Sequence, residues 1–411
     1  MTVNAPLGRV RRRSWLPAVI VTTIGLLWAT ATYVASVVQP AVSEPAFPST
    51  VGTYSWWTSG LSEGDVDAAL VVYQNGIGVE FLDTPQAVVL GTNGSTYRRL
   101  GVAERLGNPA DQGDPAESVL SPDGTFVVVA NPGSDGGVVV ATLGDGTPRS
   151  IDIGDGRSAL PVSIAADGKS VLLLAHHDGL SRYSTEDFRL HGDLVNLNLE
   201  TGEVQDYPEL NDVNSAALSP DGSRIVADTA EGIVVANAAD GKIQAIGLPD
   251  IDSPYLDGDA WSPDSGSFAF LNGSTLHVVE VAELGGVTTE VSYQPVPLDG
   301  VEYGTAIGWR DNTTALVHTE NGSGDNHSFF SWVDVESGER EQFSEYTPDF
   351  TGAALGSADI ARDLVATMQI ADLPNNRGVI PYVVNVALVL ILGLVVMAVS
   401  PARRKAEPEA G

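Results

Sequence analysis

One short unit recurs through the middle of the sequence: an apolar run, a turn that contains an aspartate, and a second apolar run. The strongest copies lie at 118–130, 162–174, 216–227 and 260–270, and weaker copies lie at 307–317 and 355–365. Their turn aspartates are Asp123, Asp167, Asp221, Asp264, Asp311 and Asp359. These aspartates follow one another at intervals of 44, 54, 43, 47 and 48 residues. Such spacing indicates that the region is built from repeats of one supersecondary unit.

The residue types of the unit predict a β-hairpin. In the clearest copies, at 121–124 and 219–222, the turn reads Ser-Pro-Asp-Gly. Proline presets the second turn position, aspartate bonds to the backbone that follows it, and glycine accepts a positive φ angle. The flanking runs are rich in Val, Ile, Leu, Phe and Ala and are too short for helices, so we expect buried strands.

A second, more polar hairpin is interleaved with the first. Its copies span 86–100, 138–153, 194–207, 233–246, 276–291 and 329–343. Six inner and six outer hairpins would make six four-stranded sheets. The lone inner hairpin at 353–370 would then pair with the outer hairpin at 86–100, with 87–90 and 364–367 on neighbouring strands. This circular closure removes free sheet edges. An extra hairpin at 70–82 leaves a seventh sheet as the alternative.

The Ser-Pro-Asp-Gly turns, with the variant at 262–266, resemble the repeat of TolB-type, WD-like β-propellers. The resemblance covers roughly residues 66–370 and implies an all-β propeller with six blades, or seven. It also implies a bacterial, and more narrowly an actinobacterial, membrane-anchored member of the family. Relatives with this repeat are mostly binding and scaffolding domains, so the resemblance indicates the fold far better than the activity.

Two uncharged apolar runs, 16–38 and 379–399, bracket the repeats. Each can span the hydrocarbon core, which takes about 20 helical residues. Basic residues precede the first run and follow the second, and an excess of Lys and Arg marks cytoplasmic flanks. We therefore expect cytoplasmic ends at 1–15 and 400–411, two plasma-membrane helices at 16–38 and 379–399, a stalk at 39–65, and an extracytoplasmic propeller at 66–373. A cleaved signal peptide is the alternative for the first run, although the run exceeds the usual core of about 7–15 residues.

Charge and cysteine content exclude several functions. The chain has 21 basic and 53 acidic residues, a formal charge of −32, and no cysteine. Without the seven basic and two acidic residues outside the two apolar runs, the region between them carries −37. This charge would repel a nucleic-acid backbone, so we expect no nucleic-acid partner. The absence of cysteine excludes disulfides, thiolate zinc sites, iron–sulfur clusters and cysteine nucleophiles.

One candidate metal site lies in the loop that lengthens one repeat to 54 residues. His176, His177 and Asp178 stand at the start of this loop, and His191 and Asp193 stand at its end. Imidazole and carboxylate ligands together suit a transition metal. The spacing matches no established zinc signature, and an exposed polar loop is the alternative.

Two other patterns resemble functional motifs but lack the surrounding residues or elements that those motifs require. Asp250, Asp252, Asp257 and Asp259 form the densest acidic run, and carboxylate oxygens suit Ca²⁺. The run lacks the residue order of a calcium loop, so we expect a solvated loop at the propeller mouth. Residues 60–64 match Gly-x-Ser-x-Gly, but no strand–turn–helix context surrounds them. The sequence therefore predicts no catalytic residue and no required cofactor.

Two hypotheses about function follow. The first is a non-catalytic membrane-anchored propeller that binds a protein or an envelope component. The alternative is a propeller enzyme, a metal-dependent hydrolase or lyase with its site at the channel mouth. Histidines and carboxylates that converge from several blades would favour the enzyme, whereas scattered ones would favour binding.

Overall fold

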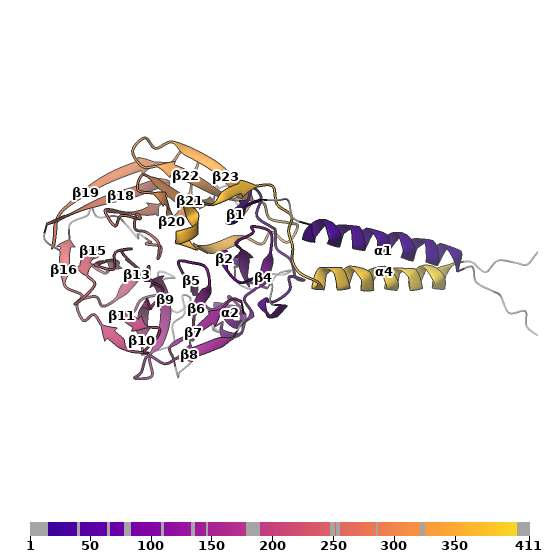
Figure 1. Cartoon of the computed structure of the whole chain (residues 1–411), viewed down its shortest axis with the longest axis horizontal. Helices are drawn as coiled ribbons and strands as arrows, with labels where there is room; N and C mark the ends of the chain where they lie inside the picture. Colours follow the sequence, from indigo (N-terminus) through magenta and orange to yellow (C-terminus); the bar gives the residue numbers. More distant parts are fainter. Residues whose placement is uncertain are drawn as a thin grey trace, which may run out of the picture.

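Six β-sheets form a closed ring, and two long helices leave it from the rim in the computed structural model (Figure 1). The structure describes residues 15–38, 42–63, 66–77, 84–107, 111–132, 136–144, 147–177, 190–246, 251, 255–284, 287–320 and 325–400. The ring is an all-β, six-bladed propeller, which confirms the fold predicted from the repeats.

Each blade is an antiparallel sheet, and its strands follow one another in order from the ring axis outward. Blade 1 contains β24 (Leu355–Ile360), β2 (Ala69–Asn75), β3 (Gln86–Gly91) and β4 (Tyr97–Arg99). Blade 2 contains β5 (Ser118–Leu120), β6 (Phe126–Ala130), β7 (Val138–Thr142) and β8 (Pro148–Ile151). Blade 3 contains β9 (Ser158–Ile164), β10 (Ser170–His176), β11 (Asp193–Asn198) and β12 (Val204–Asp206).

The other three blades follow the same order. Blade 4 contains β13 (Val213–Leu218), β14 (Arg224–Thr229), β15 (Gly232–Asn237) and β16 (Ile243–Ile246). Blade 5 contains β17 (Ser267–Asn272), β18 (Thr275–Leu284) and β19 (Val287–Pro297). Blade 6 contains β20 (Tyr303–Asp311), β21 (Thr314–Glu320), β22 (Ser328–Asp334) and β23 (Arg340–Tyr346). In blade 5, bridges from Tyr255 and Trp261 to β17 take the place of an inner strand.

The hydrophobic core lies between the blades. Val127 and Val129 of β6 pack toward blade 1, whereas Val128 packs toward blade 3, because successive strand residues point to opposite faces. Both faces of an inner strand are therefore buried, which explains why these strands read as continuous apolar runs. A cluster that includes Tyr73, Phe330 and Ile360 joins blade 6 to blade 1 and completes the ring.

The repeated turns have the chemistry expected from their sequence. Asp123 Oδ1 accepts hydrogen bonds from Ser121 Oγ at 2.8 Å and from the backbone N–H of Thr125 at 3.0 Å. The same bond to the N–H two residues later forms at Asp167, Asp221, Asp264 and Asp311. Asp359 is the exception, because its carboxylate bonds to a different blade.

The ring closes through one strand from the C-terminal part of the propeller. β24 pairs antiparallel with β2, with Val71 opposite Ile360, and β2 pairs with β3. The expected closure within the sheet of 86–100 is confirmed. The expected pairing of 87–90 with 364–367 is wrong, because 87–90 lie between β2 and β4. Residues 362–365 form the helix α3 (Arg362–Val365) instead of a second strand. The alternative of seven blades is wrong as well, because β2 of the extra hairpin belongs to blade 1. Residues 78–82 of that hairpin lie outside the described part.

The segments that lead to the two helices run side by side along the rim of blades 1 and 6. β1 (Ala46–Pro48) pairs in parallel with β25 (Gln369–Ala371), and Thr50 bridges to Glu345 of β23. On blade 1, η1 (Leu61–Glu63) follows a bridge from Gly60 to Arg99, and α2 (Gly101–Leu106) follows β4. Closure of the ring therefore brings the two segments that lead to the long helices to the same place on the propeller.

The helices α1 (Leu16–Val37) and α4 (Ile380–Val399) lie alongside each other (Figure 1). A Cβ atom at Gly393 would overlap Thr22 Oγ1, so glycine permits this close approach. Tyr33 and Tyr382 lie with their rings 4.9 Å apart at the propeller end of the pair. The helices have 22 and 20 residues, and both are long and apolar enough to cross a membrane.

Two glycines of equivalent turns allow a matched test of ring packing. Gly124 and Gly222 both have positive φ, +75° and +72°, but an added Cβ would overlap the carbonyl oxygen of Ala69 at Gly124 and meet nothing within 4 Å at Gly222. Gly222→Ala should cost ~1 kcal/mol of stability through its backbone conformation. Gly124→Ala should cost ~2 kcal/mol more, because blades 1 and 2 must separate.

Chemical unfolding of both variants measures this difference. Equal losses of stability would contradict the close contact between Gly124 and Ala69 that joins blade 2 to blade 1.

Candidate functional site

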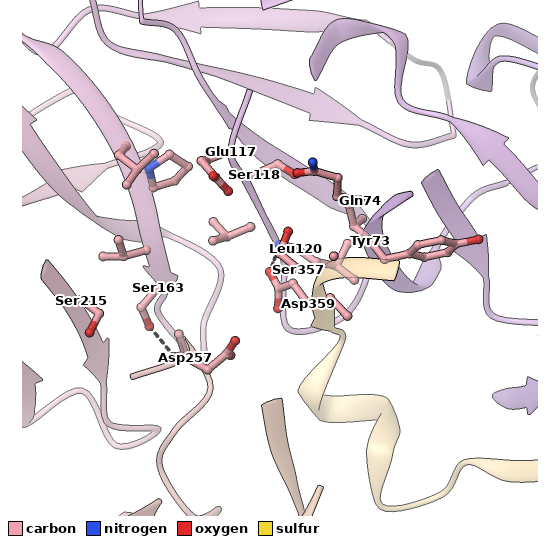
Figure 2. A pocket seen from close by; sticks show the side chains of 18 of the residues that line it. Tyr73, Gln74, Glu117, Ser118, Leu120, Ser163, Ser215, Asp257, Ser357 and Asp359 are labelled. Atoms are coloured by element: carbon pink, nitrogen blue, oxygen red, sulfur yellow. Dashed lines mark hydrogen bonds between the residues drawn. The ribbon is translucent and has the colours of Figure 1, made fainter. Parts of the chain in front are cut away.

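A cavity of about 330 Å³ lies at the centre of the ring (Figure 2). Its walls come from the inner strands of blades 1 to 4 and from the segment before Trp261 in blade 5. Most of the wall is apolar, and the polar lining includes Glu117, Ser163, Asn214, Asp257 and Asp359. No Lys or Arg is found among the described residues that line it, so the cavity has an acidic character.

Three carboxylates meet beside this cavity, and two of them, Asp257 and Asp359, line it. One oxygen each from Asp257, Asp259 and Asp359 lies within 4.8 Å of the others. Asp257 and Asp259 belong to the segment that leads into blade 5, and Asp359 belongs to β24 of blade 1. Figure 2 shows Asp257 and Asp359 directed toward the same space. The cluster therefore depends on the arrangement of blades 5 and 1 around the axis.

Neighbouring groups hold these side chains in place. Asp359 Oδ2 accepts a hydrogen bond of 2.5 Å from the N–H of Leu120 in blade 2. Asp257 Oδ1 accepts one of 3.1 Å from the N–H of Asp259. Arg362, which begins α3, donates from Nη1 to Asp259 Oδ1 at 2.7 Å and from Nη2 to the carbonyl oxygen of Ile164 at 2.6 Å. One guanidinium thus faces three carboxylates.

Burial, together with this imbalance of charge, raises the pKa of the three aspartates. Burial, and then the neighbouring charge of Asp259, raises the pKa of Asp257 to about 8. Burial raises the pKa of Asp259 although Arg362 opposes the shift. Burial, followed by repulsion from Asp259 and Asp257, raises the pKa of Asp359 well above its ordinary value. Carboxylates that share a site resist losing all of their protons, so near neutral pH the cluster favours a bound proton or a cation.

The donor set decides which cations the cluster could hold. Carboxylate oxygens are the ligands of Ca²⁺ and Mg²⁺, whereas transition metals usually take imidazole or thiolate ligands as well. Among the described residues, the group of three or more potential ligands that come this close contains aspartates only. A hard divalent cation therefore fits these residues better than zinc or copper does.

A second cavity of about 270 Å³ adjoins the first on the side of blade 6. Asp257 and Ser357 line both cavities, and His318 and Glu320 of β21 line the second. Burial lowers the pKa of His318 to about 4, so its imidazole is neutral near pH 7. The ring of His318 stacks on Phe330 with centroids 4.9 Å apart. This contact makes His318 part of the core between blades 6 and 1.

The histidines predicted as metal ligands lie in blade 3, away from the carboxylate cluster. His176 ends β10 and His177 follows it, both exposed, while Asp193 begins β11 opposite Ala175. His191 Nδ1 lies 3.4 Å from Asp212 Oδ1. Asp178 lies outside the described residues, so a metal site in this loop stays a prediction. Leu190, at the end of the same loop, lines the central cavity.

The structure corrects the expectation for part of the acidic run. Asp250 and Asp252 lie outside the described residues, but the side chain of Asp259 is only 11% exposed, so this segment is not simply a solvated loop. The repeat spacing predicts a turn at Asp359, but this residue lies in β24. The sequence contains an indication against a turn at this position. This copy of the repeat reads Gly-Ser-Ala-Asp-Ile at 356–360 and lacks the proline and the glycine that make the turn.

No protein-family model and no curated protein matches this sequence. Solved structures with a similar arrangement include a nidogen/laminin complex, with 12% identity and a TM-score of 0.46 over 72% of this chain and 99% of that chain. An oligogalacturonate lyase from Vibrio parahaemolyticus has 10% identity and a TM-score of 0.43 over 72% and 85%. A putative TolB from Agrobacterium tumefaciens has 12% identity and a TM-score of 0.34 over 70% and 83%. These similarities concern the fold alone.

The raised pKa of Asp257 predicts how stability depends on pH. The folded chain keeps a proton up to about pH 8 that the unfolded chain releases near its ordinary pKa of 3.8. Between these values the folded state binds more protons, so the free energy of unfolding should fall as the pH rises. Asp257→Asn should flatten this decline in thermal unfolding between pH 4.5 and 8.5, measured with a chelator present.

Asp299→Asn, at an exposed position, is the matched control and should keep the decline of the wild type. A decline of the same size in Asp257→Asn would show that Asp257 does not carry the proton.

Proposed function

We propose that this protein is a non-catalytic propeller, anchored in the plasma membrane of a bacterium, that binds a protein or envelope component on the extracytoplasmic side. The observation that carries the proposal is the central cavity of about 330 Å³ in a closed ring. Rigid rings with a lined central cavity suit ligand binding, because polar groups are positioned before the ligand arrives.

The anchoring part of the proposal rests on the two helices and their flanks. Both are apolar along their length, and basic residues lie beyond each outer end. The positive-inside rule then places both ends of the chain in the cytoplasm and the ring outside. The helices leave from the rim of the ring rather than from one of its faces (Figure 1), so we expect the central cavity to stay clear of the bilayer. A partner in the envelope could reach it without meeting the membrane.

The lining indicates which ligands the cavity would accept. Glu117, Asp257 and Asp359 contribute acidic groups, and the region outside the membrane carries a formal charge of −37. Such a field concentrates cations and repels anions. We therefore expect a ligand, or the part of a ligand that enters the cavity, to be neutral or cationic.

The alternative is an enzyme, a metal-dependent hydrolase or lyase, with its active site at the mouth of the central cavity. Its support is the set of three aspartates from two blades. Such chemistry would also require a group that activates water or transfers a proton to the substrate. The carboxylates converge as an enzyme would require, but His318, the histidine that lines the second cavity, is stacked on Phe330 in the core, so we place binding first and catalysis second.

Filling the mouth of the cavity tests the binding role. Ser357 lines both cavities and is exposed, so Ser357→Trp should fill the entrance without disturbing the core. Ser150→Trp adds the same side chain to exposed β8 on the outer edge of blade 2 and is the matched control. In cross-linked pull-downs from native membranes, partners recovered with the wild type and with Ser150→Trp should be reduced about tenfold with Ser357→Trp, because the site is lost.

Equal recovery of the partners with both tryptophan variants would overturn the cavity as the binding site.

A reporter that is active only in the cytoplasm tests the topology. Fused after Gly411, it should be active, and inserted between Glu231 and Gly232 in the exposed β14–β15 turn, it should be silent. If the fusion after Gly411 is silent although the protein is expressed, the two-span topology is wrong.

A further inference from the structure

Three large aromatic side chains are exposed together beside the start of the second long helix. Trp56 and Trp57 are 41% and 47% exposed, and Phe350 is 79% exposed. The rings of Trp56 and Phe350 lie edge to face with centroids 6.2 Å apart. We call Trp56, Trp57 and Phe350 the aromatic patch. Exposed aromatic groups in a cluster usually mark a surface that binds another phase or molecule.

The patch is held on a rigid base. Tyr54 is buried, packs edge-on against Trp56 at 6.4 Å, and donates a hydrogen bond of 3.0 Å to the carbonyl oxygen of Thr84. Gln86 Nε2 donates a hydrogen bond of 3.1 Å to the carbonyl oxygen of Ser55. The aromatic patch is therefore fixed to blade 1.

The same segment is bonded directly to the start of α4. Ser59 N–H donates to the carbonyl oxygen of Arg377 at 2.9 Å, and the N–H of Ile380 donates to Ser59 Oγ at 3.3 Å. Arg377 Nη1 donates to Thr58 Oγ1 at 2.8 Å. Trp57 precedes Ser59 by two residues, so their Cα atoms are at most about 7 Å apart. The patch thus lies next to the residue at which the second helix begins.

The length of α4 fixes the depth in the bilayer at which the aromatic patch would lie. Its 20 residues span about 30 Å, which is the thickness of the hydrocarbon core. Ile380 then lies at the edge of that core, and the headgroup layer beyond it is roughly 5–8 Å thick. Tyr33 and Tyr382 lie in contact at the same end of the helix pair, with their rings tilted by 35°, and tyrosine is enriched at membrane interfaces.

We propose that the aromatic patch rests in the headgroup layer of the bilayer and holds the propeller with its rim against the membrane. The proposal rests on the membrane anchoring proposed above. Indole rings favour this layer because one side of the ring is apolar and the N–H is polar. The lipid surface that the patch contacts should carry no net charge, because the −37 charge of the region outside the membrane repels anionic headgroups.

Docking of the rim would have a consequence for binding. Hydrogen bonds join Thr58 and Ser59 to Arg377 and Ile380, so the ring and the start of α4 would tilt together relative to the bilayer. A third contact on blade 1 would restrict that tilt, so that the mouth of the central cavity keeps a fixed direction along the membrane surface. Partners in the same membrane would then meet the cavity in one orientation.

Tryptophan quenching by brominated lipid tests the docking on the full chain. The chain is placed in phosphatidylcholine nanodiscs with plain or brominated acyl chains. The emission of Trp56 and Trp57 is the difference between the wild type and the variant Trp56→Phe/Trp57→Phe, which keeps aromatic rings. This difference should fall about twofold or more in brominated discs, because indoles at the interface lie close to the acyl chains.

Two further variants separate docking from anchoring. Trp28 lies on α1, and Trp332 is buried in blade 6. The emission lost in Trp28→Phe therefore reports quenching within the proposed membrane span, and the emission lost in Trp332→Phe reports quenching inside the ring. Quenching of Trp28 and of the aromatic patch, without quenching of Trp332, supports the proposal. Quenching of Trp28 alone overturns docking and leaves anchoring intact. No quenching of Trp28 overturns the anchoring and the docking together.

Discussion

The pairing of β24 with β2 is the contact on which the rest of the molecule depends. It joins residues near 71 to residues near 360, removes the free edge that each would otherwise present, and buries the cluster between blades 6 and 1. It also carries the chain past the axis and back to the rim where it entered, so that β25 lies beside β1 and α4 beside α1. Closure, the central site and the common anchor point are thus consequences of one strand pairing.

The same pairing assembles the carboxylate cluster. Asp359 is carried into the axis by β24, where it meets Asp257 and Asp259 from blade 5, and Arg362 turns back from α3 to bind Asp259. The cluster is costly, because one guanidinium cannot neutralise three half-buried carboxylates. A proton or a hard cation relieves this cost, and either would link the state of the cavity to its surroundings through the raised pKa of Asp257.

The two long helices leave the propeller from its rim. They start beside the outer strands of blades 1 and 6 rather than at either face of the ring (Figure 1). The exposed Trp56 and Phe350 stand at that same rim. The helices and the aromatic patch thus lie at the rim, apart from the residues that line the central cavity.

The sequence by itself determined the repeat, the hairpins and a ring of six or seven blades, because turn chemistry and short apolar runs act over a few neighbouring residues: Asp123 and Asp221 bond to N–H groups two positions away. The place of β2 within blade 1 then decided for six. The sequence also determined the two apolar helices, whose length and composition are local properties. Only the tertiary structure decided the role of Asp359, which shares the repeat spacing but bonds to Leu120 of another blade. It likewise decided that β24 pairs with β2, and that Asp257 and Asp259 meet Asp359 from a distant part of the chain. The order of the hairpins predicts that the ring closes within the sheet of 86–100, but the pairing of individual strands and the meeting of side chains at the axis depend on packing between distant segments, which no local pattern of residues encodes.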